Sequence, residues 1–240
     1  MGRTLIVGCS FVENIALKHP QPHQRINTDR FLLLGTSGAG NQSIAARIID
    51  QCSQEKFDRV VAIWSGINRL DFPIGRALHE VQPVDKMGYP AYPYWTRTGE
   101  TVWYHSGGFC LSGTSDQCPK FMRDFFYNQY LGSSARYLTD LTVLAVLSAQ
   151  NFLTAQNIPY DMSFIYDIDK RYIDDKIEPG CGKIDRSSPW VRMIDWQKFT
   201  KMTPPYEYAL AQGRLEDGFH PVFDCMIQWI QQAFDIDLKS

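Results

Sequence analysis

The sequence predicts an α/β fold, with helices on both sides of a central parallel β-sheet, in a single domain that spans residues 1–240. Short apolar runs typical of buried strands alternate with segments of helical periodicity through the first third of the chain. Strands connected through helices pair in parallel, and the helices cover both faces of the sheet. The chain has 240 residues, of which 44% are hydrophobic, which is enough for one complete hydrophobic core. We therefore expect a three-layer α/β/α arrangement.

The alternation begins at the N-terminus. Strands are predicted at residues 4–8, 31–34 and 59–64, each of which is a short apolar run. Helices are predicted between them at residues 11–18 and 42–51. In the second of these helices the apolar residues share one helical face, at Ile44, Ala45, Ile48 and Ile49.

The pattern breaks after Asn68, and we interpret residues 73–130 as an insertion. Pro and Gly recur from residue 73 to residue 119 among many Tyr and Trp residues. One hairpin is predicted there, around residues 101–104. A long segment without regular structure is unusual in a compact domain and is usually functional.

The second half of the chain returns to regular structure. Helices are predicted at residues 121–130, 135–157 and 222–234, and a fourth strand at residues 162–166. Residues 170–190 are polar, with Gly and Pro, and are predicted to be mostly loop.

Composition argues against several function classes. Charged residues make up 21% of the chain, the net charge is -2, and no Lys/Arg run occurs, so no nucleic-acid surface is expected. The N-terminus lacks the pattern of a signal peptide, and no uninterrupted apolar run approaches the ~20 residues of a membrane span. We therefore expect a protein that is neither conventionally secreted nor embedded in a membrane.

The six Cys residues are scattered without a C-x-x-C pair, which argues against a zinc site and against a dense disulfide framework. We expect free thiols. A disulfide between Cys110 and Cys118 is the alternative in an oxidising compartment.

Polar segments follow the three N-terminal strands. Gly8-Cys9-Ser10 follows the first strand, a Gly-rich loop that contains Gly38 follows the second, and Ser65-Gly66-Ile67-Asn68 follows the third. Ligands bind at the carboxyl ends of the strands in open α/β sheets, so these segments are expected at one site. A fourth segment, Asp217-Gly218-Phe219-His220, precedes the last predicted helix.

These residue types fit acyl transfer. The Ser10 hydroxyl is a weak nucleophile until a base removes its proton, and His220 is the candidate base. Asp217 would orient the His220 ring and stabilise its charged form. The backbone N–H groups of Ser10 and Gly38 and the side-chain amide of Asn68 would hold the oxyanion.

The four segments resemble the four blocks of the SGNH (GDSL-like) hydrolase family, in the same order. They stand here as GCS with Ser10, TSG with Gly38, GIN with Asn68, and DGFH with Asp217 and His220. The GCSF start, the WSG third block and the DGFHP ending also resemble esterase-like proteins of bacteriophages.

The resemblance implies a flavodoxin-like α/β/α sandwich with about five parallel strands and a serine esterase that needs no metal or organic cofactor. Because the sequence shows neither a signal peptide nor a membrane span, we expect a cytoplasmic or virion-associated protein. This chain departs from the family pattern at two positions. Cys9 replaces the Asp before the nucleophile, and Arg69 replaces the Asp after Asn68. Both substitutions change the charge beside the site and neither removes a catalytic group.

The aromatic residues of the insertion suggest the substrate. Tyr94, Trp95 and Trp103 are the candidate substrate-binding residues, because flat rings with polar edges suit sugar rings. No apolar groove for a long acyl chain is evident in that segment. We therefore expect an ester of a short acyl group, acetyl, on a small or polymeric carbohydrate. The alternative is a non-catalytic glycan-binding or structural module with the same fold.

Alternatives also exist for the individual residues. Ser10 could cap the helix that follows it. The Gly35–Asn41 loop could bind phosphate, although it lacks the Lys of a Walker motif. Cys9 could be a nucleophile, but a Cys at the end of a strand is more often a small buried apolar residue.

Overall fold

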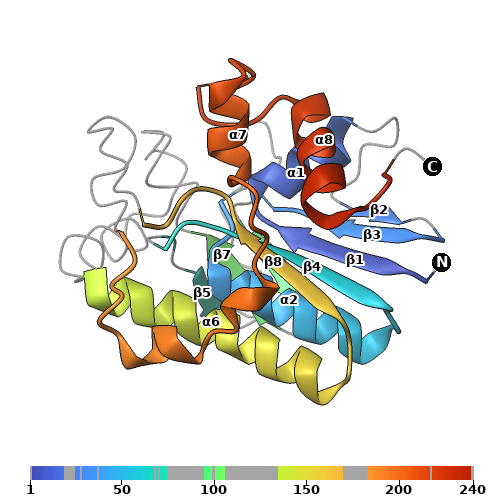
Figure 1. Ribbon diagram of the computed structural model, residues 1–240. Coiled ribbons are helices and arrows are strands. Elements are labelled where there is room, and N and C mark those ends of the chain that lie inside the picture. Colours follow the sequence, from blue (N-terminus) through green and yellow to red (C-terminus); the bar gives the residue numbers. More distant parts are fainter. Residues whose placement is uncertain are drawn as a thin grey trace, which may run out of the picture.

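The computed structural model contains a central five-stranded β-sheet and a smaller three-stranded sheet. It describes residues 2–18, 25–27, 29–36, 38–67, 69, 71–74, 95–98, 101–105, 135–169, 183–216 and 218–238. The strands of the central sheet are β1 (Thr4–Gly8), β2 (Arg25–Asn27), β3 (Phe31–Leu34), β4 (Arg59–Trp64) and β8 (Tyr160–Phe164). Their order across the sheet is β2-β3-β1-β4-β8 (Figure 1).

Four of these strands are parallel. β1 lies between β3 and β4, and β8 pairs with the far side of β4. The expectation of a fully parallel sheet is wrong at one edge, where β2 pairs antiparallel with β3. β2 is a short polar strand, Arg25-Ile26-Asn27, which has no apolar run that would mark it in the sequence. The chain is therefore an α/β protein with a parallel sheet and one antiparallel edge strand.

Helices cover both faces of the sheet (Figure 1). The main helices are α1 (Ser10–Lys18), α2 (Asn41–Gln54), α6 (Ala135–Ala155), α7 (Pro205–Ala211) and α8 (Phe223–Phe234). α1 packs with α8 on one face, and α2 packs with α6 on the other. Two short 3-10 helices, η2 (Pro189–Met193) and η3 (Trp196–Lys198), come after β8 in the chain. η2 contacts α6, and η3 contacts β8.

The sheet forms the hydrophobic core. Every residue of β1 is buried, as are the last five residues of β4, which is the pattern of parallel strands covered on both faces. β1, β3 and β4 have the predicted bounds. β8 begins and ends two residues before the predicted 162–166, because Ile165 and Tyr166 are buried after the chain has left the sheet.

The helix predictions are confirmed for α1, α2, α6 and α8, with ends that differ by a few residues. α7 and the two 3-10 helices were not predicted. α7 begins at the second residue of the Pro204-Pro205 pair, a sequence typical of a loop, and η2 begins inside the predicted 170–190 loop. Residues 170–182 lie outside the described part of the chain.

α6 is the one described helix that is long and apolar enough, by length and composition alone, to cross a membrane. Half of its Arg136–Ala155 window is buried inside the protein. Its packing against α2 and η2 is that of a core helix.

The second sheet comes from the insertion. Its strands are β5 (Asp71–Ile74), β6 (Trp95–Thr98) and β7 (Thr101–His105), in the order β5-β7-β6 and all antiparallel. The predicted hairpin is confirmed as the β6–β7 pair. β5 was not predicted because it contains Pro73, which is tolerated in an edge strand. Most of residues 73–130, with the helix predicted at 121–130, lies outside the described residues.

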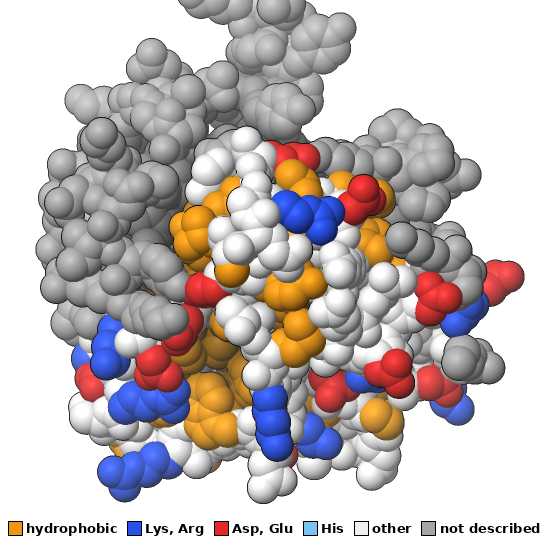
Figure 2. Space-filling view, turned by 45° about the horizontal axis from the view of Figure 1, so that its top comes forward, with side chains coloured by type: hydrophobic (Ala, Val, Ile, Leu, Met, Phe, Trp, Pro, Cys, Tyr) orange, Lys and Arg blue, Asp and Glu red, His pale blue; other side chains and the backbone are white. Residues whose placement is uncertain are grey.

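Figure 2 shows the side chains on one face of the molecule. Acidic and basic side chains of the described residues are interspersed there, and hydrophobic side chains emerge between them in small groups.

Candidate active site

Ser10 lies where β1 ends and α1 begins. β1 finishes at Gly8, and Ser10 is the first residue of α1. Its side chain is 4% exposed. The order of the parallel strands reverses at β1, since the chain moves to β3 on one side and then to β4 on the other. Ligands of open α/β sheets bind at that point, outside the carboxyl ends of the strands.

His220 meets Ser10 from the other end of the chain. The Nε2 atom of His220 lies 2.8 Å from the Oγ atom of Ser10, a hydrogen bond between residues 210 positions apart. With Nε2 as the acceptor, the Ser10 hydroxyl donates and the ring proton sits on Nδ1. This is the contact that a base needs in order to remove a proton from a serine nucleophile.

A closed turn presents His220. The backbone N–H of Glu216 donates to the carbonyl of His220 at 2.8 Å, and Leu215 forms an antiparallel bridge with Pro221. Val222 N–H donates to the carbonyl of Arg214 at 2.9 Å, just before α8 begins. The backbone on both sides of His220 is thereby fixed. Asp217, the predicted orienting acid, lies within this turn in the sequence but outside the described residues.

Aromatic rings surround the imidazole. The rings of Phe11 and Phe219 have centroids 5.5 and 5.3 Å from that of His220, and Phe219 meets it edge to face. Phe11 and Phe219 also contact each other edge to face, and Tyr206 tilts against Phe219. The neighbouring rings leave His220 few alternative positions. Sequence analysis did not single out these three residues, although Phe11 and Phe219 are the immediate neighbours of Ser10 and His220.

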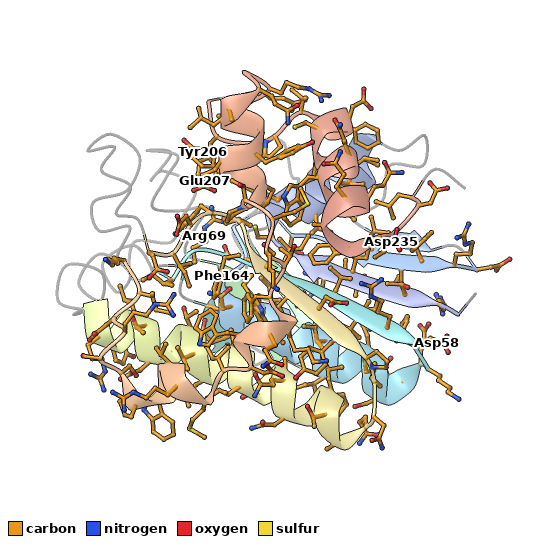
Figure 3. All side chains as sticks on the ribbon, in the orientation of Figure 1. Asp58, Arg69, Phe164, Tyr206, Glu207 and Asp235 are labelled. Carbon is orange, nitrogen blue, oxygen red and sulfur yellow. The ribbon has the colours of Figure 1, made fainter. Side chains whose placement is uncertain are left out.

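The first turn of α7 is joined to the residues that follow β8. The backbone N–H of Tyr206 donates to the carbonyl of Ile165, and the Glu207 carboxylate accepts from the backbone N–H of Asp167 at 2.9 Å. Tyr206, Glu207 and Arg69 all lie on the side of the sheet where the strands end (Figure 3). Arg69, which stands where the SGNH pattern that the sequence resembles has Asp, is only 3% exposed.

The structure describes some of the predicted oxyanion donors. Gly38 is buried and has φ +73°, a conformation that favours glycine, in the loop that follows β3. Asn68 lies outside the described residues, between Ile67 and Arg69, which are both buried. Ser10 and His220 are therefore brought together directly, and Gly38 lies in a loop at the same edge of the sheet.

Buried polar side chains lie beneath these loops. Asn41, Arg47 and Asp71 are each at most 8% exposed, and the buried hydroxyls of Thr36 and Thr142 are among their hydrogen-bond partners. Burial lowers the pKa of Arg47 to about 10, and the carboxylates of Glu13 and Asp71 oppose this shift, so Arg47 stays charged at neutral pH. Arg47, Asp71 and Glu13 were missed by the sequence analysis.

Cys9 is completely buried and free, as the packing interpretation predicts. Cys52 and Cys225 are also free, and burial raises the pKa of the Cys52 thiol to about 12. Cys110 and Cys118 lie outside the described residues. Among the residues that the structure describes, no cluster of three or more His, Cys, Asp or Glu side chains could hold a metal ion.

The predicted substrate-binding residues are the least described. Tyr94 lies outside the described residues. Trp95 begins β6 and Trp103 lies in β7, where the pairing places Trp95 opposite Tyr104 and Trp103 opposite Thr96. Only the backbone of these strands is described.

No family model, curated protein or solved structure matches this chain. A function must therefore be argued from the geometry of the site.

Proposed function

We propose that this protein is a serine esterase of the SGNH (GDSL-like) type, in which Ser10 is the nucleophile and His220 the base. The observation behind the proposal is the 2.8 Å hydrogen bond between Ser10 Oγ and His220 Nε2 at the carboxyl edge of the sheet. A serine and a histidine from opposite ends of a chain form such a contact only when the fold brings them together. Their meeting at the edge where α/β proteins bind ligands favours a catalytic pair.

The reaction would run in two steps. Ser10 Oγ attacks the carbonyl carbon of the ester while His220 Nε2 takes its proton, and the oxyanion accepts hydrogen bonds from Ser10 N–H, Gly38 N–H and the Asn68 amide. The C–O bond to the alcohol breaks, and the alcohol leaves with the proton from His220. A water then gives its proton to His220 and attacks the acyl-enzyme, which releases the acid and restores Ser10.

The layout of the sheet supports this assignment. The four parallel strands lie side by side in the order β3, β1, β4, β8. Counted along the chain, this is second, first, third, fourth, which is the beginning of the flavodoxin-like order. The GCS segment follows β1, the Gly38 loop follows β3, the GIN segment follows β4, and the DGFH segment precedes α8. Each block thus stands beside the element that the family pattern requires.

A non-catalytic module with this fold is the second candidate. It is favoured by the low exposure of Ser10, which is 4%. The helix-cap interpretation of Ser10 is not supported, because the Cys9 carbonyl accepts the first helical hydrogen bonds, from Val12 and Glu13 N–H, and Ser10 is the first residue inside α1. The non-catalytic module predicts that the Ser10–His220 contact has no consequence for catalysis.

Turnover of an aryl acetate by the wild type and by Ser10→Ala separates these candidates. We expect saturable hydrolysis that falls by about 10³-fold or more in Ser10→Ala, with an unchanged melting temperature. Ser43→Ala is the matched control, because Ser43 is also buried in the first turn of a helix and its hydroxyl contacts only the Gly40 carbonyl among the contacts seen. Equal rates in all three proteins would refute the esterase proposal.

The substrate proposed is a carbohydrate with an acetyl ester. The support is the composition of the insertion and its place in the chain, since β5 begins at Asp71, three residues after Asn68. β6 and β7 continue the same sheet and contain Trp95 and Trp103. Aromatic rings suit the C–H faces of sugars, and their polar edges suit the hydroxyls.

A substrate panel tests this choice. Acetylated saccharides are compared with aryl esters of increasing chain length, for the wild type and for Trp95→Ala. We expect the highest kcat/KM with acetyl esters and a selective loss of saccharide turnover in Trp95→Ala, with aryl acetate turnover retained. A preference for long acyl chains would exclude the short-acyl proposal.

A further inference from the structure

Beneath the proposed oxyanion loops lies a buried polar cluster that the catalytic steps do not use. Its members are Glu13, Asn41, Arg47 and Asp71, which are 5%, 0%, 8% and 8% exposed. Charged and amide side chains are seldom buried to this extent unless they are paired. They come from α1, α2 and β5, the elements that begin at or follow the three N-terminal motifs.

Asp71 holds the start of α2. One carboxylate oxygen accepts from the backbone N–H of Gly40 and the other from that of Ser43, both at 2.8 Å. The first N–H groups of a helix have no partner within it, and a side chain at the N-cap position normally supplies one. Here the N-cap residue is Gly40, which has no side chain, and Asp71 reaches it from 31 positions further along the chain.

Glycine is required at position 40 because the start of α2 lies very close to Arg69 and Asp71. A Cβ atom at position 40 would lie 2.7 Å from the carbonyl oxygen of Arg69 and 2.8 Å from Asp71 Oδ2. A local cap by Ser or Asp at position 40 would therefore push the 69–71 segment away. The fold instead brings that segment against the start of α2 and uses its carboxylate as the cap.

Arg47 anchors the other end of the Gly38 loop. Its guanidinium donates to the hydroxyl of Thr36 at 2.8 Å, and that hydroxyl donates to the carbonyl of Gly35. Glu13, in the first turns of the helix that begins with Ser10, attracts the same guanidinium, as Asp71 does. The Gly38 loop is thus fixed at Thr36 by Arg47 and at Gly40 by Asp71.

Asn41 ties α2 to the segment that follows β4. Its side-chain oxygen accepts from Ser65 N–H at 2.8 Å, and its Nδ2 group donates to the carbonyls of Ser65 and Gly66. Nδ2 also donates to the Thr142 hydroxyl at 3.2 Å, and that hydroxyl donates to the carbonyl of Ile67. In the sequence, Asn68 stands between this anchored stretch and Asp71.

We propose that Asp71 and Asn41 are positioning residues for the two proposed oxyanion donors. Asp71 holds the end of the Gly38 loop at Gly40, and Asn41 holds Ser65 and Gly66, which precede Asn68 in the sequence, against the start of α2. This inference rests on the proposed esterase function. Oxyanion donors act in the transition state, and their effect depends on being placed before the reaction begins. Loss of the tether should therefore lower kcat and leave KM largely unchanged.

The test combines turnover with a tetrahedral mimic. In Asp71→Asn, one of the two backbone N–H groups would face an amide NH₂ in place of an acceptor, at nearly constant volume. We expect kcat for aryl acetate to fall by about 10- to 100-fold with KM within about threefold. The Ki of an aryl trifluoromethyl ketone, whose adduct with Ser10 has an oxyanion, should rise by a similar factor. Binding of the aryl alcohol product should not change.

A matched pair on α6 separates positioning from stability. Thr142→Val removes a hydroxyl that joins Asn41 to Ile67, whereas Thr139→Val, one turn away, removes a buried hydroxyl that accepts from Asp185 N–H at 2.9 Å. Both should lower the melting temperature by similar amounts. We expect kcat and ketone affinity to fall about three- to tenfold in Thr142→Val and to stay within about twofold in Thr139→Val.

Failure of the esterase proposal and failure of the positioning role alone give different results. If the wild type shows neither Ser10-dependent turnover nor ketone binding, the esterase proposal is overturned and the positioning role with it. If the wild type is active and folded Asp71→Asn and Thr142→Val match Thr139→Val in kcat and ketone affinity, the positioning role alone is overturned, and Asp71 serves only to cap α2. Should Asp71→Asn fail to fold, Thr142→Val decides between these outcomes.

Discussion

The region around Ser10 and the region around His220 are held in place by different kinds of contact. On the Ser10 side, buried side chains hold the loops after β3 and β4, and the Asp71 carboxylate among them accepts hydrogen bonds from the backbone N–H groups of Gly40 and Ser43. On the His220 side, a closed backbone turn and the rings of Phe11 and Phe219 fix the imidazole. The first region depends on hydrogen bonds of buried side chains, and the second on backbone hydrogen bonds of the turn together with the packing of aromatic rings.

This difference suits the roles proposed for the two regions, which are oxyanion stabilisation and proton transfer. Oxyanion donors must point at one atom, and directional hydrogen bonds specify such positions well. A base that takes a proton and later gives it back needs a fixed ring plane, which packing against aromatic edges provides. Changes on the polar side should therefore act through transition-state stabilisation, and changes on the aromatic side through the placement of the base.

The largest effect is expected at the base itself. His220→Ala should lower kcat/KM by about 10³-fold or more, and Asp217→Asn by somewhat less, because the ring would remain in place. Steady-state kinetics on aryl acetate measures both. An unchanged kcat/KM in Asp217→Asn would show that another group orients His220.

The next effect concerns Asn68. Asn68→Ala should lower kcat by about 10²-fold with a smaller change in KM, because the amide would contact the substrate mainly in the transition state. The same assay separates the two constants. A change confined to KM would make Asn68 a substrate-binding residue.

On the aromatic side, Phe219→Leu should lower kcat by about tenfold, because His220 would lose the ring that meets it edge to face. Phe234→Leu is the matched control, since Phe234 meets Trp229 edge to face within the α8 region and has no contact with His220 among those described. It should cost about 1 kcal/mol of stability and leave kcat unchanged. Equal kcat values in the two variants would mean that the turn alone positions the base.

Cys9 tests whether the residue next to the nucleophile takes part in the chemistry. Cys9→Ser should keep most of the activity and lower the free energy of unfolding by about 1–3 kcal/mol, because a hydroxyl would replace a fully buried thiol. Denaturant unfolding and kinetics on the same preparation measure both quantities. Complete loss of activity in a folded variant would contradict the packing role.

The smallest effect is expected far from the site, at the Asp169–Arg186 ion pair. Hydrogen bonding by Arg186 lowers the pKa of Asp169 below its ordinary value of 3.8, so the pair stabilises the fold above that pH and loses this effect as the pH falls through the lowered pKa. Both side chains are nearly half exposed, so Asp169→Asn should cost less than about 1 kcal/mol at pH 7. Urea unfolding at pH 7 and at strongly acidic pH should show the difference between the two proteins disappear, with activity unaffected at pH 7.

The parts of the fold that the sequence revealed are those with long apolar patterns. β1, β3 and β4 are continuous apolar runs with clear ends, and they were predicted to the residue. β2 is three residues with one apolar side chain, and β5 contains a proline, so neither has a periodic signal. The antiparallel edge follows from pairing between segments, which local patterns do not encode.

The site divides in the same way. Ser10 and His220 were predicted as a pair because their residue types and order fit a known chemistry, and their side chains lie within hydrogen-bond distance. Asp71 could not be identified, because its contacts are with backbone N–H groups 28 and 31 positions away. Arg47 did leave a signal, since it shares the buried face of α2 with Ile44 and Ile48, where a charge is out of place.

The most direct test of the proposed catalytic pair, Ser10 and His220, is the phosphonylation of Ser10. Wild-type protein treated with a fluorophosphonate should form one adduct per chain, located by mass spectrometry on the peptide that contains Ser10. The adduct should be absent in Ser10→Ala and should form about 10²-fold more slowly or worse in His220→Ala, because the hydroxyl would lose the base that its geometry provides. An adduct elsewhere, or labelling of Ser10 at the same rate without His220, would contradict the proposal that these two residues act together.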